Sequence, residues 1–212
     1  MGFGLGEQTI KDLIAHVMQG GGDYHITRHA MYTALKNKLA AHDDAQKRCL
    51  SISGSNGLGQ TLGLKASAYV AADYPDHDMS NLGFGDGEFD FCISDQVLEH
   101  VEGDPFAAVQ ESARVVKPGG FICHTTCFIN EIHGVPKDFW RFTPDSLALL
   151  CGAADCEIIS CDGWGNREAW ALIDLGFRFT KIPNDPANPI HKLAIRNEPL
   201  WPIVVWVLAQ KR

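Results

Sequence analysis

A short apolar run, a helical pattern and a second apolar run, in that order, constrain this chain more than any other feature. The first run, Phe89 to Ser94, ends at Asp95, and the second, Phe121 to Cys127, follows the helix-breaking residues 117–120 (KPGG). Between the runs, apolar residues recur at helical spacing along one broad face: Val97, Leu98, Val101, Phe106, Val109 and Ala113. Strand, helix and strand form a βαβ unit, and such units build open parallel sheets that bind ligands at the carboxyl ends of their strands.

Further apolar runs predict the rest of an α/β sheet. We expect core strands at Cys49 to Ser53, Ser67 to Ala72 and Glu157 to Ser160, and a last strand at Ile203 to Ala209. The residues around Asp78 to Phe84 carry a weaker signal that fits either a short strand or a turn. Thr143 followed by Pro144 is typical of a helix start, with threonine as the N-cap.

The chain length of 212 residues predicts a single domain, residues 1–212, with a substantial core. Its N-terminal part, residues 8–41, contains two helical patterns, Gln8 to Met18 and Thr27 to about Ala41. Residues 163–202 form an insertion with five prolines, and a loop of this size is usually functional or disordered.

Charge and composition exclude several classes of protein. The net charge is −8 and lysine and arginine form no cluster, so we expect no nucleic-acid partner. The N-terminus lacks the basic start and apolar core of a signal peptide, and the longest apolar stretch, Trp201 to Ala209, is too short to span a bilayer. These features predict a soluble, cytoplasmic protein without a membrane span.

Seven cysteines, an odd number without CxxC spacing, fit a reducing compartment better than a disulfide framework. A zinc site could be imagined from Cys123, His124, Cys127 and His133. Strand alternation points neighbouring side chains to opposite faces, so no metal site is expected there.

The spaced phrase FDFCISDQVLEHV…ARVVKPGG, which begins at Phe89, resembles the motifs of class I S-adenosylmethionine (SAM)-dependent methyltransferases, of the small type with an LEHV helix. The resemblance implies a three-layer, Rossmann-like sheet that is mostly parallel, with one antiparallel strand near the C-terminus. It also implies SAM as the cofactor, and it suggests that residues 8–41 cover the cofactor cleft as a lid. Packing of these helices against the edge of the sheet is an equal alternative.

The family pattern assigns a SAM site residue by residue. A glycine-rich turn after the first strand would lie against the cofactor, with Ser53, Gly54 and Gly57 as contacts. Asp73, at the end of the second strand, would accept hydrogen bonds from the ribose hydroxyls. Asp78 would accept from the adenine amino group, and Met79 would pack on the adenine ring. Serines at 51, 53 and 55 depart from the family's acidic and glycine-rich version of this loop.

The residues after the fourth predicted strand have two interpretations. Asp95 could cap the following helix, or Asp95 and Gln96 could face the methionine moiety of SAM, as the resemblance implies. Glu99 and His100 would lie one turn further along that helix. His100 is the second candidate for a catalytic base, although a structural role is the more common one for such a histidine.

The acceptor side is expected in the stretch HGVPKDFWRFTPDSL, which resembles small methyltransferases of glycan and cell-envelope biosynthesis. His133 is the first candidate for a general base, because an oxygen acceptor gains from a base with a near-neutral pKa. Asp138, Trp140 and Arg141 are the candidate substrate contacts, and packing of the aromatic side chains onto the sheet is the alternative.

Methyl transfer from SAM to a small-molecule or glycan-type acceptor, at oxygen, is therefore the predicted function. The absence of an Asn/Asp-Pro-Pro-Tyr/Phe tetrad after the fourth strand disfavours methylation of adenine or glutamine nitrogen. Two alternatives stay open: a non-catalytic relative with weak or no SAM binding, and an NAD(P)-dependent oxidoreductase, which shares the glycine-rich turn and the strand-end acid. The sequence gives no oligomeric state.

Overall fold

The protein is described here by a computed structural model that covers residues 6–17, 21–134 and 137–212. It divides into two compact units, one formed by Leu35–Gly163 with Val204–Arg212 and the other by Met1–Ala34 with Trp164–Ile203. Within the described residues no helix combines the length and the apolar character that a membrane span requires.

A six-stranded sheet forms the centre of the first unit. Its strands follow the order β2-β1-β3-β4-β6-β5. The first four are parallel neighbours, and β6 runs antiparallel to β4. The bounds of the strands are β1 Arg48–Ile52, β2 Ala68–Ala72, β3 Phe89–Asp95, β4 Val116–Cys127, β5 Cys156–Trp164 and β6 Val204–Lys211. This arrangement confirms the predicted fold, including the parallel pairing of the runs that begin at Cys49 and Phe89.

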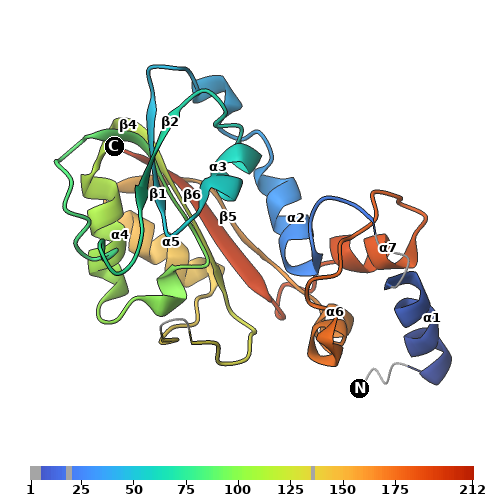
Figure 1. Cartoon of the computed structure of the whole chain (residues 1–212). Coiled ribbons are helices and arrows are strands. Elements are labelled where there is room, and N and C mark those ends of the chain that lie inside the picture. The colour runs from blue at the N-terminus through green and yellow to red at the C-terminus, as the bar shows by residue number, and fades with distance from the viewer. Residues whose placement is uncertain (1–5, 18–20, 135–136) are drawn as a thin grey trace. The chain divides into compact units, whose positions relative to one another are not determined.

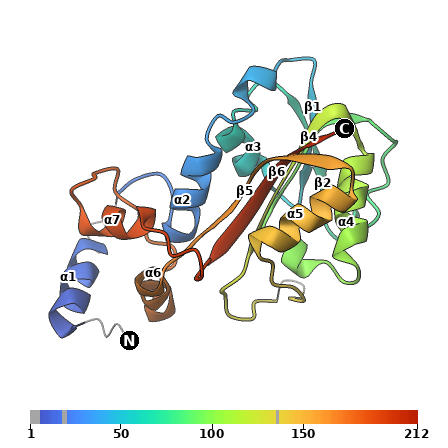
Figure 2. The same ribbon diagram turned by 180° about the vertical axis from the view of Figure 1, so that it is seen from behind.

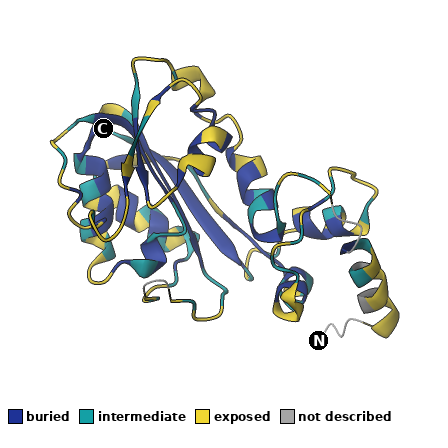
Figure 3. Cartoon of the chain, in the orientation of Figure 1, coloured by how far each residue is buried: buried dark blue, intermediate teal, exposed yellow. Residues whose placement is uncertain are grey.

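Helices cover both faces of this sheet and make three layers. Helices α4 (Pro105–Arg114) and α5 (Pro144–Ala153) lie on one face, and α3 (Asn56–Leu62) lies on the other (Figures 1 and 2). The central strands are buried on both faces, which explains why they read as continuous apolar runs (Figure 3). Short 3₁₀ turns complete the unit at η1 (Ala40–His42) and η2 (Leu98–His100).

Two local predictions were wrong. The helix expected directly after Asp95 begins at Pro105, because Asp104 is the N-cap and its side chain accepts a hydrogen bond from the Phe106 N–H. Strand β4 begins at Val116 and runs through the expected KPGG break, with a register irregularity opposite Phe89 and Phe91. Of the two alternatives left open near Asp78, a short strand or a turn, the structure has the turn, since only an isolated bridge joins Asp78 to Asn81.

The helix start at Thr143 is confirmed in atomic detail. The Thr143 hydroxyl accepts from the Ser146 N–H at 3.1 Å, and the Ser146 hydroxyl accepts from the Thr143 N–H at 2.9 Å. The two residues form a capping box, with Pro144 at the first helical position. Helix α5 therefore begins at a fixed point, soon after the loop that follows β4.

The second unit is helical, with α1 (Glu7–Val17), α2 (Ile26–Leu35), α6 (Arg167–Leu172), a π-helical turn η3 (Ile173–Phe177) and α7 (Pro189–Ile195). The insertion at residues 163–202 is therefore not a long loop. The Asn166 side chain accepts from the Ala169 N–H at the start of α6, and the Asn188 side chain accepts from the Ile190 N–H before α7. Helix α2 ends at Leu35, earlier than the expected end at about Ala41, and Asn37 adopts a positive φ of +57° shortly after it. A lid role for residues 8–41 stays a prediction.

Candidate functional site

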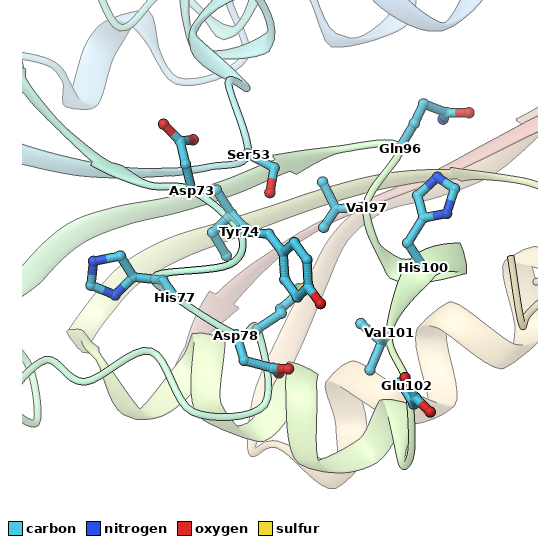
Figure 4. A pocket seen from close by; sticks show the side chains of 12 residues that line it. Ser53, Asp73, Tyr74, His77, Asp78, Gln96, Val97, His100, Val101 and Glu102 are labelled. Atoms are coloured by element: carbon cyan, nitrogen blue, oxygen red, sulfur yellow. The ribbon is translucent and has the colours of Figure 1, made fainter. Parts of the chain in front are cut away.

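A cavity of about 460 Å³ lies at the carboxyl ends of the parallel strands. Strands β1, β2 and β3 end at Ile52, Ala72 and Asp95, and the loops that follow them supply the walls. Figure 4 shows the residues of the loop after β2 on one side and those after β3 on the other. The lining residues are Ile52, Ser53, Asp73, Tyr74, His77, Asp78, Met79, Gln96, Val97, His100, Val101 and Glu102. The volume lies in the range usual for small-molecule and cofactor sites.

The loop after β1 turns sharply at two residues with positive φ, Ser53 at +49° and Gly54 at +75°. The Ser53 N–H donates to the Ala72 carbonyl at 3.1 Å, and the Gly54 N–H donates to Oδ1 of Asp73 at 3.1 Å. The loop is thus bonded to the end of the neighbouring strand. The sequence prediction that a glycine would be usual at position 53 agrees with the φ angle that Ser53 adopts.

Ser55 ties this loop to the next strand. Its hydroxyl donates to the Ile52 carbonyl at 2.5 Å and accepts from the Asp95 N–H at 2.8 Å. A glycine at this position would provide neither bond. The serine that departs from the family pattern therefore contributes a bridge between β1 and β3.

The loop after β2 presents polar and apolar groups to the same cavity. Oδ1 of Asp78 accepts from the Ser80 N–H at 2.7 Å and from its hydroxyl at 2.6 Å, while the Met79 side chain is buried against the core. Tyr74 is 59% exposed and also lines the cavity. His77 stacks on Phe84 with ring centroids 5.1 Å apart. Sequence reasoning missed Tyr74 and His77, although both lie within four residues of the strand-end Asp73.

Asp95 and Gln96 take different positions at the end of β3. The Asp95 carboxylate accepts from the Thr125 hydroxyl at 2.5 Å, and Asp95 is not among the lining residues. Gln96 lines the cavity and adopts φ +59°, and its side-chain amide lies 3.3 Å from Oγ1 of Thr125. Of the eight predicted cofactor contacts, Ser53, Asp73, Asp78, Met79 and Gln96 line the cavity, and Gly54, Gly57 and Asp95 do not.

His100 is the predicted base that lines the cavity. It lies in η2, and its Nδ1 is 2.6 Å from the Lys137 carbonyl. A carbonyl only accepts, so Nδ1 carries a proton, and in the neutral ring Nε2 is the nitrogen with the lone pair. His133, the other predicted base, packs edge-on against His100 with ring centroids 4.9 Å apart, but it does not line the cavity.

A buried carboxylate lies behind His133. Oε1 of Glu99 is 3.9 Å from Nε2 of His133, and Oε2 of Glu99 accepts from the Thr126 hydroxyl at 2.7 Å. Burial raises the pKa of Glu99, and the hydrogen bond from the Thr126 hydroxyl partly offsets that rise. Backbone N–H groups of Phe139 and Trp140 donate to the Glu99 carbonyl. The loop segment that carries Phe139 and Trp140 is therefore hydrogen-bonded to η2.

The three predicted substrate contacts bind other parts of the protein, and none lines the cavity. Arg141 donates to both oxygens of Asp138, at 2.5 and 2.7 Å, and this hydrogen-bonded fork holds the pKa of Asp138 well below its usual range. The Trp140 indole donates to the Val101 carbonyl at 2.9 Å. A role in acceptor binding for Asp138, Trp140 and Arg141 stays a prediction.

Comparisons with known proteins agree with this geometry. Residues 37–124 match a family model described as a methyltransferase domain. An uncharacterized methyltransferase of Schizosaccharomyces pombe is 40% identical over 58 residues, which are 27% of this chain and 20% of that protein, so the match spans about a fifth of the relative.

Two solved structures share the fold at low identity. One is the 1,6-didemethyltoxoflavin-N1-methyltransferase of Burkholderia thailandensis, solved with 1,6-didemethyltoxoflavin and S-adenosylhomocysteine, at 13% identity and a TM-score of 0.56 over 96% of this chain and 83% of that one. The other is a SAM-dependent methyltransferase from Archaeoglobus fulgidus, at 14% identity and a TM-score of 0.52 over 78% of this chain and 86% of that one.

Proposed function

We propose that this chain is a class I SAM-dependent methyltransferase and that it transfers a methyl group from SAM to a hydroxyl of a small-molecule or glycan-type acceptor. The observation that carries the proposal is the cavity at the ends of β1, β2 and β3, because five of the residues that the family pattern assigns to SAM line it together. Sites in open α/β sheets form at this end of the strands.

SAM would extend across the mouths of the three strands. The adenine would lie between Met79 and the exposed ring of Tyr74, with its amino group near Asp78. The ribose hydroxyls would donate to Asp73, whose carboxylate is already oriented by the Gly54 N–H. The methionine moiety would run towards Gln96. The buried apolar side chain of Met79 and the carboxylates of Asp73 and Asp78 suit an adenosine with one apolar face and several donors.

The chemistry needs alignment more than activation, because the sulfonium of SAM is itself the electrophile. A lone pair of the acceptor oxygen forms a bond to the methyl carbon, and the carbon–sulfur bond breaks with its electron pair going to sulfur. The products are the methyl ether and S-adenosylhomocysteine. The hydroxyl proton goes to the imidazole of His100, which lines the cavity, with His133 as the alternative base.

Two measurements test the proposal on the full chain. Calorimetric titration should detect binding of SAM and of S-adenosylhomocysteine and no binding of NAD. Incubation with methyl-labelled SAM should then label hydroxyl-bearing glycans or small molecules in preference to amines. Binding of NAD alone would assign the cavity to a dehydrogenase, and the lack of any nucleotide binding would make the protein a non-catalytic relative. Labelling of amines alone would remove oxygen as the acceptor atom.

A further inference from the structure

Three side chains of different chemistry converge beside the loop that follows β4. Glu99 from η2, Cys127 from the end of β4 and His133 from the following loop each bring one potential ligand atom to within 4.8 Å of the other two. They span only 35 positions of the chain, but they come from three separate local structures. Sequence reasoning considered Cys127 and His133 together and did not include Glu99.

Only one of the two carboxylate oxygens of Glu99 accepts a hydrogen bond from the described residues. Its side chain is 0% exposed, and Oε2 accepts from Thr126, but no described group donates to Oε1. A buried carboxylate oxygen without a partner costs free energy, because it has given up water without compensation. A cation bound at Oε1 would remove that cost.

His133 is oriented so that one ring nitrogen faces Oε1 of Glu99. Its Nδ1 lies 3.1 Å from Oδ2 of Asp138 and 3.3 Å from the Glu131 carbonyl, and both oxygens are acceptors. The Asn130 amide lies 3.0 Å from the same nitrogen and presents an acceptor when its oxygen and nitrogen are exchanged. A proton on Nδ1 leaves Nε2 unprotonated at 3.9 Å from Oε1. That separation is too long for a hydrogen bond, and it suits two ligands of one metal ion.

The neighbours of these ligands form the outer shell that metal sites use. Metal-bound histidines usually donate their second nitrogen to a carboxylate or a carbonyl, and metal-bound carboxylates are themselves hydrogen-bonded. Asp138 and the Glu131 carbonyl provide this for His133, and Thr126 provides it for Glu99. Arg141 fixes Asp138 through two hydrogen bonds. The supporting contacts of Glu99 and His133 are thus in place.

We propose that Glu99, Cys127 and His133 bind a zinc ion, with a fourth coordination position left open. Zinc accepts oxygen, nitrogen and sulfur ligands in one tetrahedral site, and catalytic zinc sites have three protein ligands and one exchangeable position. Magnesium and calcium prefer oxygen ligands alone, and they do not suit a cysteine and a histidine. His133 is 35% exposed at its side chain, so solvent or substrate reaches this side of the cluster.

The zinc site rests on the proposed function and specifies its acceptor chemistry. A hydroxyl bound at the open position would have a lowered pKa and would become a better nucleophile towards SAM. Coordination uses the lone pair of His133 Nε2, so His100 is the base of the metal-bound protein. The hydroxyl proton passes to His100, the carbon–oxygen bond forms and the carbon–sulfur bond of SAM breaks. His100 packs against His133 and lines the cavity, which joins the two sites.

Cobalt(II) is the probe that tests this site without SAM or an acceptor. The full chain is treated with a chelator and titrated with Co²⁺, a spectroscopic substitute for zinc. We expect one equivalent to bind and to give a thiolate-to-cobalt charge-transfer band that added Zn²⁺ removes. Cys127→Ser should lose the band. Cys161→Ser is the matched control, because Cys161 is the most exposed of the seven cysteines and lies outside the cluster.

Further variants identify the other two ligands. Glu99→Gln and His133→Gln should each weaken Co²⁺ binding by more than the about 10–100-fold that loss of an outer-shell partner costs. The proposal is overturned if wild type gives no thiolate band, or if the band survives Cys127→Ser and disappears in Cys161→Ser. SAM titration of the same samples separates the two proposals, because SAM binding without a cobalt band rejects only the metal site. Cobalt binding without SAM binding rejects only the proposed function.

Discussion

The carboxylate of Asp73 accepts a hydrogen bond of 3.1 Å from the backbone N–H of Gly54, which fixes the ends of β1 and β2 against each other. The same carboxylate lines the cavity and is exposed to it. A single acidic side chain therefore both shapes the glycine-containing loop and presents an oriented acceptor to a bound ribose. This double role makes Asp73 the most direct probe of the cofactor site.

Asp73→Ala should weaken SAM binding by about 1.5–3 kcal/mol, because hydrogen bonds to a charged group contribute in this range. That loss corresponds to roughly a 10- to 150-fold higher Kd in a calorimetric titration. Asp76→Ala is the matched control, since Asp76 is exposed in the same loop and does not line the cavity. Equal SAM affinity in wild type and Asp73→Ala would show that ribose lies elsewhere.

Substitution of Ser53 and of Ser55 by glycine should change the free energy of unfolding in opposite directions. Ser53 has φ +49°, a conformation that is costly for a residue with a Cβ and free of that cost for glycine. We expect Ser53→Gly to raise the free energy of unfolding by about 0.5–1 kcal/mol after the greater chain entropy of glycine is counted. Urea unfolding without SAM measures the difference.

Ser55→Gly is the comparison for that experiment. The variant loses the hydrogen bonds to the Ile52 carbonyl and from the Asp95 N–H, so it should unfold about 1–3 kcal/mol more easily. A stabilised Ser55→Gly would contradict the role assigned to the Ser55 hydroxyl, and a destabilised Ser53→Gly would contradict the role assigned to the φ angle of Ser53.

His124 should make the stability of the fold depend on pH. It is buried in β4, its Nδ1 lies 2.8 Å from the Ser94 hydroxyl, and burial lowers its pKa to about 4 from the ordinary 6.5. Between these values the unfolded chain binds more protons than the folded one. The stability linked to His124 is therefore complete above pH about 6.5 and is lost as the pH falls towards about 4, by roughly 3 kcal/mol in total.

The variant His124→Leu isolates this contribution from that of other titrating groups. Its free energy of unfolding should fall less between pH 7 and about pH 4.5 than that of wild type, measured by urea unfolding. His42→Leu is the control for removal of an imidazole, because His42 is exposed. Parallel curves for wild type and His124→Leu would mean that His124 is protonated in the folded state.

The sequence predicts the sheet well because burial on both faces leaves a simple pattern. The apolar runs beginning at Cys49, Phe89 and Phe121 are typical of buried strands and lie in adjacent strands, and Thr143 with Pro144 marks a helix start by local chemistry alone. These features depend on neighbours in the chain or on simple burial. They need no knowledge of which groups meet across the fold.

Contacts between distant residues explain what the sequence could not predict. Asp95 looked like a helix cap, but the Thr125 hydroxyl 30 positions away occupies its carboxylate, and Asp104 caps the helix instead. Glu99 fits the pattern of an exposed helical glutamate. Glu99 is buried instead, because it lies in the 3₁₀ turn η2. The Thr126 hydroxyl donates a hydrogen bond to its carboxylate. Prolines in residues 163–202 suggested a loop, while Asn166 and Asn188 start helices there.

The two histidines beside the cavity should separate in a kinetic comparison. His100 lines the cavity, whereas His133 packs against His100 and does not line it. His100→Gln should lower kcat by about 10²–10⁴-fold and leave the Kd for SAM nearly unchanged, because general-base catalysis contributes in this range and the base acts on the acceptor. His100→Gln should also lose the acidic limb of the pH–rate profile that protonation of the base produces.

His133→Gln is the discriminating variant, and its result depends on metal. In chelator-treated protein, a base role for His133 predicts a loss of kcat as large as that of His100→Gln, with the acidic limb removed. If His133 is a metal ligand, His133→Gln should lose less kcat than His100→Gln in chelator-treated protein. After zinc is added, the kcat of His133→Gln should fall far below that of wild type, because only wild type binds the metal and gains activity. Full activity of His100→Gln would move the base to His133. Full activity of both variants would leave the deprotonation of the acceptor to water and assign both rings to packing of the loop.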